Sequence, residues 1–390
     1  MAVVAVVTLC VCQRKTPPVE QVSVAQSRPL DAAQEPLALV PAARCGECHG
    51  NMEKEWRSSA HAQSDASPIY RAMRTASGGK HCDRCHAPLR ALAVGDPVAA
   101  EGVTCDVCHT IASVQVDRAD GTGFLPHPED NLRYGPLCDT TPHYFHRMGC
   151  SLLHRESAFC AACHNWSIRT PGGTVLSILP EYTEWRDSES AMSSFECPVC
   201  HMPGVRTEAA VGSRERSRVA NHSFVLRGTL LGRALSGQVQ IKPEGGKLRI
   251  SLMLTNSGAG HAVPTGLPER KLQVGVETLD AAGRVLSQEE HSYGRVMVDA
   301  ADREVPFYAA VKEQKDTRIR AGETRKDSFL IDVPKSGQLR VYVRWRPISA
   351  ALASQLQVVP PRDEPMLSAS VALPLLFRRN GESVTLKLQP

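Results

Sequence analysis

The chain has 390 residues, and its 45 Lys and Arg are nearly balanced by 41 Asp and Glu, which gives a formal net charge of +4. No run of Lys or Arg alternates with aromatic residues, so nothing in the sequence points to nucleic-acid binding. A chain of this length suggests roughly two or three domains. Its 14 cysteines are the strongest signal in the composition.

The N-terminus predicts export. Ala2 to Cys12 is an apolar run with the length of a signal-peptide core, too short to span a bilayer. No positive charge precedes it, so residues 1–12 are interpreted as a signal or anchor segment with a truncated start. Cys10 and Cys12 are candidates for lipid attachment, which would tether the protein to a membrane. Residues 13–41 contain five prolines among small and polar residues and read as an extended linker.

One pattern, Cys-x-x-Cys-His, organises the next part of the chain and occurs five times. It is the attachment motif of c-type haem. Two cysteines three residues apart face one side of a helical turn, so both can bond one porphyrin. The histidine that follows binds the iron from the proximal side. The five motifs are Cys45, Cys48 and His49; Cys82, Cys85 and His86; Cys105, Cys108 and His109; Cys160, Cys163 and His164; and Cys197, Cys200 and His201.

Two alternatives explain the motifs less well. Cys-x-x-Cys pairs also build zinc sites, but zinc ribbons do not require the histidine that follows every pair in this chain. A thioredoxin-like redox motif needs a single copy in a βαβ setting. We therefore expect five covalently bound haem c groups. Because bacteria attach haem covalently outside the cytoplasm, the expected location is the periplasm or another site beyond the cytoplasmic membrane.

The two halves of the chain predict different structures. Residues 42–226 hold five haems in so little protein that the porphyrins must form the core, wrapped by short helices and loops. Helices are expected over residues 53–61 and 183–192. Residues 227–390 lack cysteine and show alternating apolar and polar runs, which predict strands of an antiparallel β-sandwich. The expected strands are 247–254, 271–278, 327–333, 338–345 and 383–388.

The predicted fold class is therefore multidomain. A mainly α and irregular multihaem cytochrome c domain, residues 42–226, is followed by an all-β, sandwich-like domain, residues 227–390. No catalytic constellation stands out in the second domain, and the oligomeric state is open.

The sixth ligand of each iron decides between electron transfer and catalysis. Nine histidines lie outside the motifs, enough for bis-histidine ligation of five haems. Met73, Met148, Met192 and Met202 are more simply interpreted as packing residues. The preferred distal ligands are His61, His222, His154, His261 and His143. His127, His81 and His146 rank below them, and His291 is interpreted as structural.

The flanks of the motifs carry a resemblance. The segments Trp56 to Ala62, Glu101 to Cys105, Glu184 to Ser188, Cys197 to Pro203 and His222 to Phe224 resemble bacterial multihaem cytochromes related to the tetrahaem electron acceptor of hydroxylamine oxidoreductase. The loop Gly260 to Gly266, with Arg270, is similar to the β-domain that often follows in such proteins. The resemblance implies closely packed haems, many with two histidine ligands, and respiratory electron transfer outside the cytoplasm.

Cys138 and Cys150 have no place in that pattern. They either bridge, closing the loop around His143, or remain two thiols.

Two functions remain open. The favoured one is an electron carrier between redox partner proteins, whose identity the sequence does not give. The alternative is a multihaem oxidoreductase that acts on a small nitrogen or sulfur compound at a five-coordinate haem. Histidines sufficient for every iron favour the carrier over the enzyme.

Overall fold

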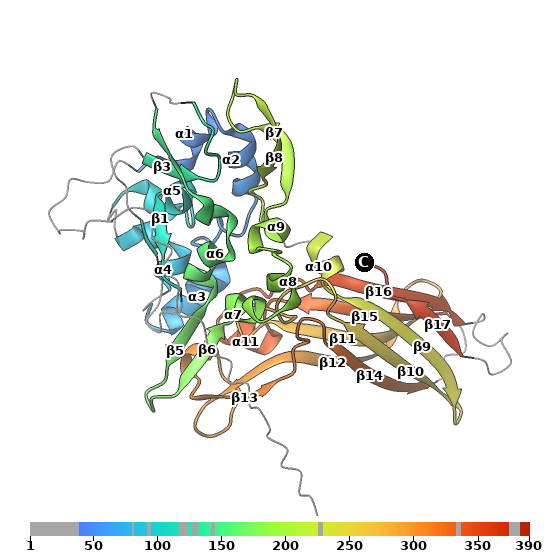
Figure 1. Cartoon of the computed structure of the whole chain (residues 1–390). Coiled ribbons are helices and arrows are strands. Elements are labelled where there is room, and N and C mark those ends of the chain that lie inside the picture. The colour runs from blue at the N-terminus through green and yellow to red at the C-terminus, as the bar shows by residue number, and fades with distance from the viewer. Residues whose placement is uncertain are drawn as a thin grey trace, which may run out of the picture.

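The computed structural model describes residues 39–79, 82–91, 95–116, 124–126, 132–141, 145–224, 229–332, 337–373 and 383–390. A region of short helices and loops comes first, and a β-rich region follows it (Figure 1). This arrangement confirms the predicted fold class. The interpretations of residues 1–38 and of His81, His127 and His143 fall outside the described residues.

The N-terminal region is built from short elements, and its longest described helix has nine residues. The helices are α1 (Ala42–Gly46), α2 (Gly50–Arg57), α3 (Pro68–Ala76), α4 (Asp83–His86), α5 (Cys105–His109), α6 (Ser157–His164), α7 (Glu181–Arg186), α8 (Glu189–Met192) and α9 (Cys197–His201), with 3₁₀ turns η1 (Pro88–Ala91), η2 (Pro97–Ala100) and η3 (Leu152–Arg155). The paired strands are β1 (Ile111–Val114) with β2 (Phe124–Pro126), β3 (Leu132–Gly135) with β4 (Arg147–Cys150), β5 (Trp166–Arg169) with β6 (Val175–Leu179), and β7 (Gly204–Glu208) with β8 (Glu215–Ala220).

Serine side chains explain why both predicted helices are shorter than expected. The helix expected over 53–61 ends at Arg57, where Ser58 donates its hydroxyl to the carbonyl of Glu55 at 2.7 Å. The helix expected over 183–192 divides into α7 and α8, and Ser188 between them donates to the carbonyl of Trp185 at 2.7 Å. In each case the serine hydroxyl competes with the backbone for a helix carbonyl.

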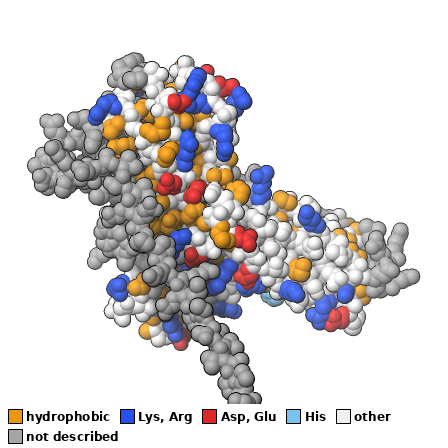
Figure 2. Space-filling view, in the orientation of Figure 1, with side chains coloured by type: hydrophobic (Ala, Val, Ile, Leu, Met, Phe, Trp, Pro, Cys, Tyr) orange, Lys and Arg blue, Asp and Glu red, His pale blue; other side chains and the backbone are white. Residues whose placement is uncertain are grey.

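Apolar packing within the N-terminal region is limited. Its main described cluster contains six buried residues: Leu89, Val98, Ala99, Val107, Ile111 and Ala162. Several large apolar side chains are instead exposed, among them Leu152, Met192 and Phe195. Figure 2 shows apolar side chains gathered over this region and its junction with the β-rich region.

The C-terminal region consists of two antiparallel sheets, preceded by α10 (Thr229–Ala234). One sheet has the order β14-β10-β9-β17 and the other the order β13-β12-β11-β15-β16. The bounds are β9 (Ser236–Glu244), β10 (Lys247–Thr255), β11 (Lys271–Leu279), β12 (Val285–Val298), β13 (Lys312–Asp316), β14 (Thr324–Asp332), β15 (Gln338–Arg346), β16 (Glu364–Ala372) and β17 (Val384–Lys387), with η4 (Phe307–Ala309) and α11 (Ala350–Gln355) in the connections.

A single core lies between these sheets. Alternate residues of β10, Leu248, Ile250, Leu252 and Leu254, are buried and pack with residues of β11 and β15 from the other sheet. Burying alternate residues on facing strands is the construction of a β-sandwich. The five expected strands correspond to β10, β11, β14, β15 and β17, whereas β9, β12, β13 and β16 were not predicted.

The two regions meet through the β5–β6 hairpin, which reaches toward β12 and β13 (Figure 1). Leu176 and Ile178 of β6 pack with Met297 and Phe307 of the C-terminal region. Beside this apolar contact, the buried guanidinium of Arg295 donates to the carbonyl of Ile178 at 2.9 Å.

Candidate haem-binding site

Each Cys-x-x-Cys-His motif forms or adjoins one helical turn, in α1, α4, α5, α6 and α9. The backbone shows the expected spacing: His49 N–H donates to the carbonyl of Cys45 at 2.8 Å, and His86 N–H to that of Cys82 at 3.1 Å. A bond from residue i to i−4 is helical. Each turn therefore places its two sulfurs and its imidazole within reach of one porphyrin.

The orientation of the motif histidines fits iron ligation. The Nδ1 atoms of His49 and His109 each lie 2.6 Å from a backbone carbonyl, of Ala209 and Tyr134, and Nδ1 of His86 lies 3.3 Å from that of Ser64. A carbonyl only accepts, so each Nδ1 carries the proton and Nε2 keeps its lone pair. A metal-binding histidine usually makes such a hydrogen bond through the ring nitrogen that does not bind the metal.

A second imidazole faces four of the five motif histidines. Two imidazoles that bind one iron from opposite sides, each nitrogen about 2 Å from the metal, have ring centres roughly 6.3 Å apart. The ring centres are 6.3 Å apart for His49 and His146, 6.3 Å for His109 and His222, 6.4 Å for His164 and His61, and 6.3 Å for His201 and His261. The residues present therefore fit four irons with two histidine ligands each.

Three of these facing histidines are ones that the sequence ranked highly. Burial lowers the pKa of His61 to about 3 and that of His222 to about 4. Both rings are consequently neutral, the form that binds a metal. The backbone of His222 is fixed to α2, because its N–H donates to the carboxylate of Glu55 at 2.7 Å. His291 keeps its interpretation as a structural residue, because its Nδ1 lies 2.9 Å from the carboxylate of Asp327 in the β-rich region.

His154 is not placed as preferred. Its ring centre lies 5.6 Å from that of His109, which already faces His222. Its Nε2 is bound to the carbonyl of Cys108 at 3.1 Å, whereas its Nδ1 is buried and has no hydrogen-bond partner. The ring also packs on Phe159, with centres 4.5 Å apart. In the structure, His154 packs beneath the third motif.

His146, which the sequence ranked low, faces His49, and His143 lies outside the described residues. His146 lies between Cys138 and Cys150, which form a disulfide. The bridge closes the loop as one of the two interpretations expected, but the described histidine that this loop presents to a motif is His146. The sequence did contain a signal for His146, because it lies three residues from His143 inside the loop that Cys138 and Cys150 enclose.

His86 differs from the other motif histidines. Within the described ranges, no histidine ring faces it at ligation spacing. Its ring stacks instead on Tyr70 of α3, with centres 4.2 Å apart and planes 14° apart. Parallel stacking at this distance covers the face of the imidazole, whereas the nitrogens that can bind a metal lie at the edge of the ring.

The five motifs lie close together. Side chains of different motifs are hydrogen-bond neighbours in three pairs: Cys45 with Cys105, Cys85 with Cys163, and Cys160 with Cys197. Cys108 also lies near Cys160 and Cys163, which connects the third motif with the fourth. All five motifs thus form one connected set.

Gly102, in the segment just before the third motif, occupies a position that requires glycine. Its φ of +71° is in the left-handed region, and a Cβ there would lie 2.7 Å from the carbonyl oxygen of His61. Only glycine fits this close approach without strain. The carboxylate of Glu101 accepts from Ala42 N–H at 3.0 Å and from Thr104 at 2.8 Å. These contacts hold the first and third motifs and the His61 turn against one another.

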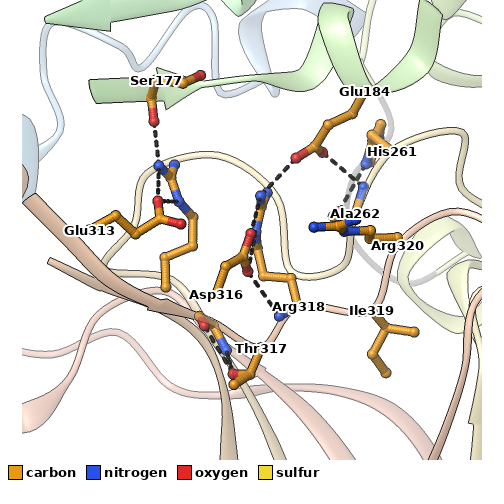
Figure 3. A network of polar contacts seen from close by, with 12 residues as sticks. Ser177, Glu184, His261, Ala262, Glu313, Asp316, Thr317, Arg318, Ile319 and Arg320 are labelled. Carbon is orange, nitrogen blue, oxygen red and sulfur yellow. Dashed lines mark hydrogen bonds and ion pairs between the residues drawn. The ribbon is translucent and has the colours of Figure 1, made fainter. Parts of the chain in front are cut away.

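A polar network anchors the loop of His261 to the N-terminal region (Figure 3). Glu184 of α7 accepts from the backbone N–H of Ala262 at 2.9 Å and from Arg318 at 2.7 Å. Arg318, 8% exposed, also pairs with Asp316 at 2.8 Å. Asn256 donates to the carbonyl of His261 at 2.8 Å. The β-rich region therefore supplies and fixes the imidazole that faces His201.

Comparison with known proteins found one matching family model and a similar solved structure. Residues 44–110, which contain the first three motifs, match the family model for cytochrome c554 and c-prime. The fold is similar to that of a penta-haem cytochrome c552 from Thermochromatium tepidum, with a TM-score of 0.69 and 22% identity over 87% of this chain and 100% of that one. No curated protein sequence matches the chain. The first three motifs thus lie in a segment that is similar to the cytochrome c554 and c-prime family, and the fold of the chain is similar to that of the penta-haem cytochrome.

Proposed function

We propose that the chain is a pentahaem c-type cytochrome that carries electrons between redox partner proteins. The observation that carries this proposal is the set of four facing histidine pairs at ligation spacing within one connected group of motifs. Each haem would supply a one-electron iron couple, and two histidine ligands favour electron transfer over substrate binding. The protein's part is to hold each imidazole pair and to bury it.

The proposed ligand sets follow from the geometry. His146, His222, His61 and His261 would be the distal ligands opposite His49, His109, His164 and His201 respectively. The ten motif cysteines would form the thioether bonds. His154 and His143 remain candidates that are not assigned to an iron, since Nδ1 of His154 is buried without a hydrogen-bond partner and His143 lies outside the described residues.

Two measurements test this proposal. The mass of the mature protein should exceed that of the polypeptide by five haems, and low-temperature EPR of the oxidised protein should show four low-spin ferric haems. A mass shift below five haems would refute the count. High-spin signals from two or more haems would refute the four ligand pairs.

One observation favours a second candidate. None of the described histidines faces His86 at ligation spacing, and we propose that the haem of the second motif keeps an open sixth position. An open position is what a multihaem oxidoreductase needs to bind a small nitrogen or sulfur compound. Steady turnover of such a compound by the isolated protein, with a high-spin signal that the compound removes, would favour the enzyme.

The proposed location is outside the cytoplasmic membrane, because covalent haem attachment takes place there. Among the described residues, none of the helices has the length and apolar character needed to cross a bilayer. Lipid attachment at Cys10 or Cys12 or an uncleaved N-terminus is the proposed route to a membrane. Redox partners would dock through a local patch, since 45 basic and 41 acidic residues create no one-sided field.

A further inference from the structure

Tyr70 lies against His86, the motif histidine that no other described histidine faces at ligation spacing. It is buried and belongs to α3, which lies beside α4 of the second motif (Figure 1). Its ring covers one face of the His86 imidazole, with ring centres 4.2 Å apart and planes 14° apart. The nitrogens that can bind a metal lie at the edge of an imidazole ring, so this cover leaves them free. Tyr70 therefore contacts a proposed iron ligand without competing for the iron.

The ring of His86 is held differently from the rings of two other motif histidines. Nδ1 of His49 and Nδ1 of His109 each lie 2.6 Å from a backbone carbonyl, and such a short hydrogen bond fixes the plane of the ring. For His86 the corresponding distance, to the carbonyl of Ser64, is 3.3 Å. A hydrogen bond of this length is weaker, so it orients the ring less firmly. The stack on Tyr70 is the second contact that limits rotation of the His86 ring.

The hydroxyl of Tyr70 is bound to the same motif. It donates to the carboxylate of Asp83, the residue that follows Cys82. Arg74, one turn further along α3, donates to both oxygens of this carboxylate at 2.7 Å, and Arg90 of η1 donates to it at 3.0 Å. α4 has only four residues, so contacts from outside the helix stabilise its position. Tyr70 thus contacts both ends of α4, its first residue through the hydroxyl and its last through the ring.

We propose that Tyr70 is a positioning residue for the second haem, because its ring fixes the plane of the proximal imidazole and its hydrogen bond to Asp83 fixes the ring. This inference rests on the proposed binding of a haem at His86. An imidazole that is free to turn can approach the Ser64 carbonyl and make a shorter hydrogen bond. Such a bond makes the imidazole a more basic ligand, which favours ferric iron and lowers the reduction potential. Tyr70 therefore keeps the potential of the second haem higher.

Four variants of the haem-loaded protein test this role. Tyr70→Leu and Tyr70→Met remove the ring and keep much of its volume, whereas Tyr70→Phe keeps the ring and removes the hydroxyl. The control is Tyr293→Leu, because Tyr293 also donates to an aspartate, Asp327, and lies near Arg325, but in the β-rich region. Haem content by mass, EPR of the oxidised protein and a potentiometric titration would be recorded for each. Fewer than five haems in the wild type would count against the proposed function, whereas full loading leaves Tyr70 as the only variable.

Each ring-free variant should lower one midpoint potential by about 30 mV or more, roughly a threefold change of the reduction equilibrium, and broaden the EPR signal of that haem. Tyr70→Phe should keep the wild-type EPR signal with a smaller shift, and Tyr293→Leu should match the wild type in both measurements.

Wild-type potentials and EPR signals in a ring-free variant with five haems would overturn the role of Tyr70. A shift in Tyr70→Phe as large as in the ring-free variants would also overturn it, because the stack would then not be the constraint. If neither ring-free variant loads five haems, Tyr70→Phe decides, since the role requires it to load five and to keep the wild-type EPR signal.

Discussion

At the scale of single residues, the distal histidines carry the strongest prediction. His222→Ala removes the ring that faces His109 at 6.3 Å, and we expect one low-spin ferric haem to become high-spin. EPR of the oxidised protein measures this change. His291→Ala is the matched control, because His291 is bound to Asp327 in the β-rich region. A spectrum of His222→Ala that matches the wild type would remove His222 from the ligand set.

The sequence predicts five motif histidines as proximal ligands, and it predicts only part of the set of histidines that face them. The motif dictates the proximal ligand by chain spacing, so those five predictions need no tertiary information. His61, His222 and His261 were ranked highly from their local sequence, and each faces a motif histidine. The roles of His146 and His154 depend on how a long connection folds back, which local sequence does not encode.

Buried charge at the third motif gives a second prediction at this scale. Asp106, 1% exposed, accepts two hydrogen bonds from Arg133 at 2.6 and 2.9 Å. Arg133→Met should destabilise the N-terminal region by about 3–5 kcal/mol, because it leaves a buried carboxylate without its cation. Chemical denaturation followed in the haem absorption band measures the loss. Arg206→Met, at an exposed pair with Glu215, should change the stability little.

At the scale of elements, the disulfide loop is the clearest case of a connection that positions a ligand. The Cys138–Cys150 bridge closes 12 residues of chain around His146 and ends at β4, which pairs with β3 in parallel. The double variant Cys138→Ser/Cys150→Ser should lose about 2–4 kcal/mol of stability. It should also show a partly high-spin first haem, as His146→Ala should show fully. A fully low-spin double variant would mean that β4 alone positions His146.

The hydrogen bonds of Glu184 are the second case in which contacts outside the motifs position a proposed ligand, His261. Glu184→Ala removes the acceptor shared by Ala262 N–H and Arg318 and should cost about 2 kcal/mol, because a buried guanidinium loses a charged partner. We expect a shifted or broadened EPR signal from the fifth haem, since the loop of His261 is then held mainly by Asn256. Glu289→Ala, at an exposed position on β12, is the control. An unaltered signal would show that the backbone pairing of Val263 with Ile319 suffices.

β12 and β13, two of the strands that were not predicted, lack the alternation that makes β10 visible in the sequence. β10 alternates between buried and more exposed residues, so its pattern is visible in the sequence. β12 begins with five exposed residues, Val285 to Glu289, and β13 is exposed throughout, so neither shows an alternating apolar face. β12 pairs with β11, and β13 pairs with β12. This pairing, rather than the composition of either segment, makes them strands.

At the scale of the whole molecule, the two regions differ in what holds them together. Composition predicted this difference, because cysteine and alternating apolar runs occupy separate parts of the chain. The contact between the regions was not predictable: Arg295 of β12 bonds to the carbonyl of Ile178, 117 residues away. Through this contact and the His261 loop, the β-rich region takes part in the haem site.

The same difference predicts how the protein behaves without its cofactor. The sandwich has a core of 21 buried apolar residues shared by both sheets, whereas the main described cluster of the N-terminal region has six. Small cores do not offset the conformational entropy of the chain. Protein produced in a host without haem attachment should therefore keep a folded β-rich region and lose the N-terminal one. Limited proteolysis with mass spectrometry should leave a resistant fragment starting near residue 229, and the haem-loaded protein is the control. Equal resistance of residues 42–224 in the haem-free protein would show that the polypeptide, and not the porphyrins, forms the core of that region.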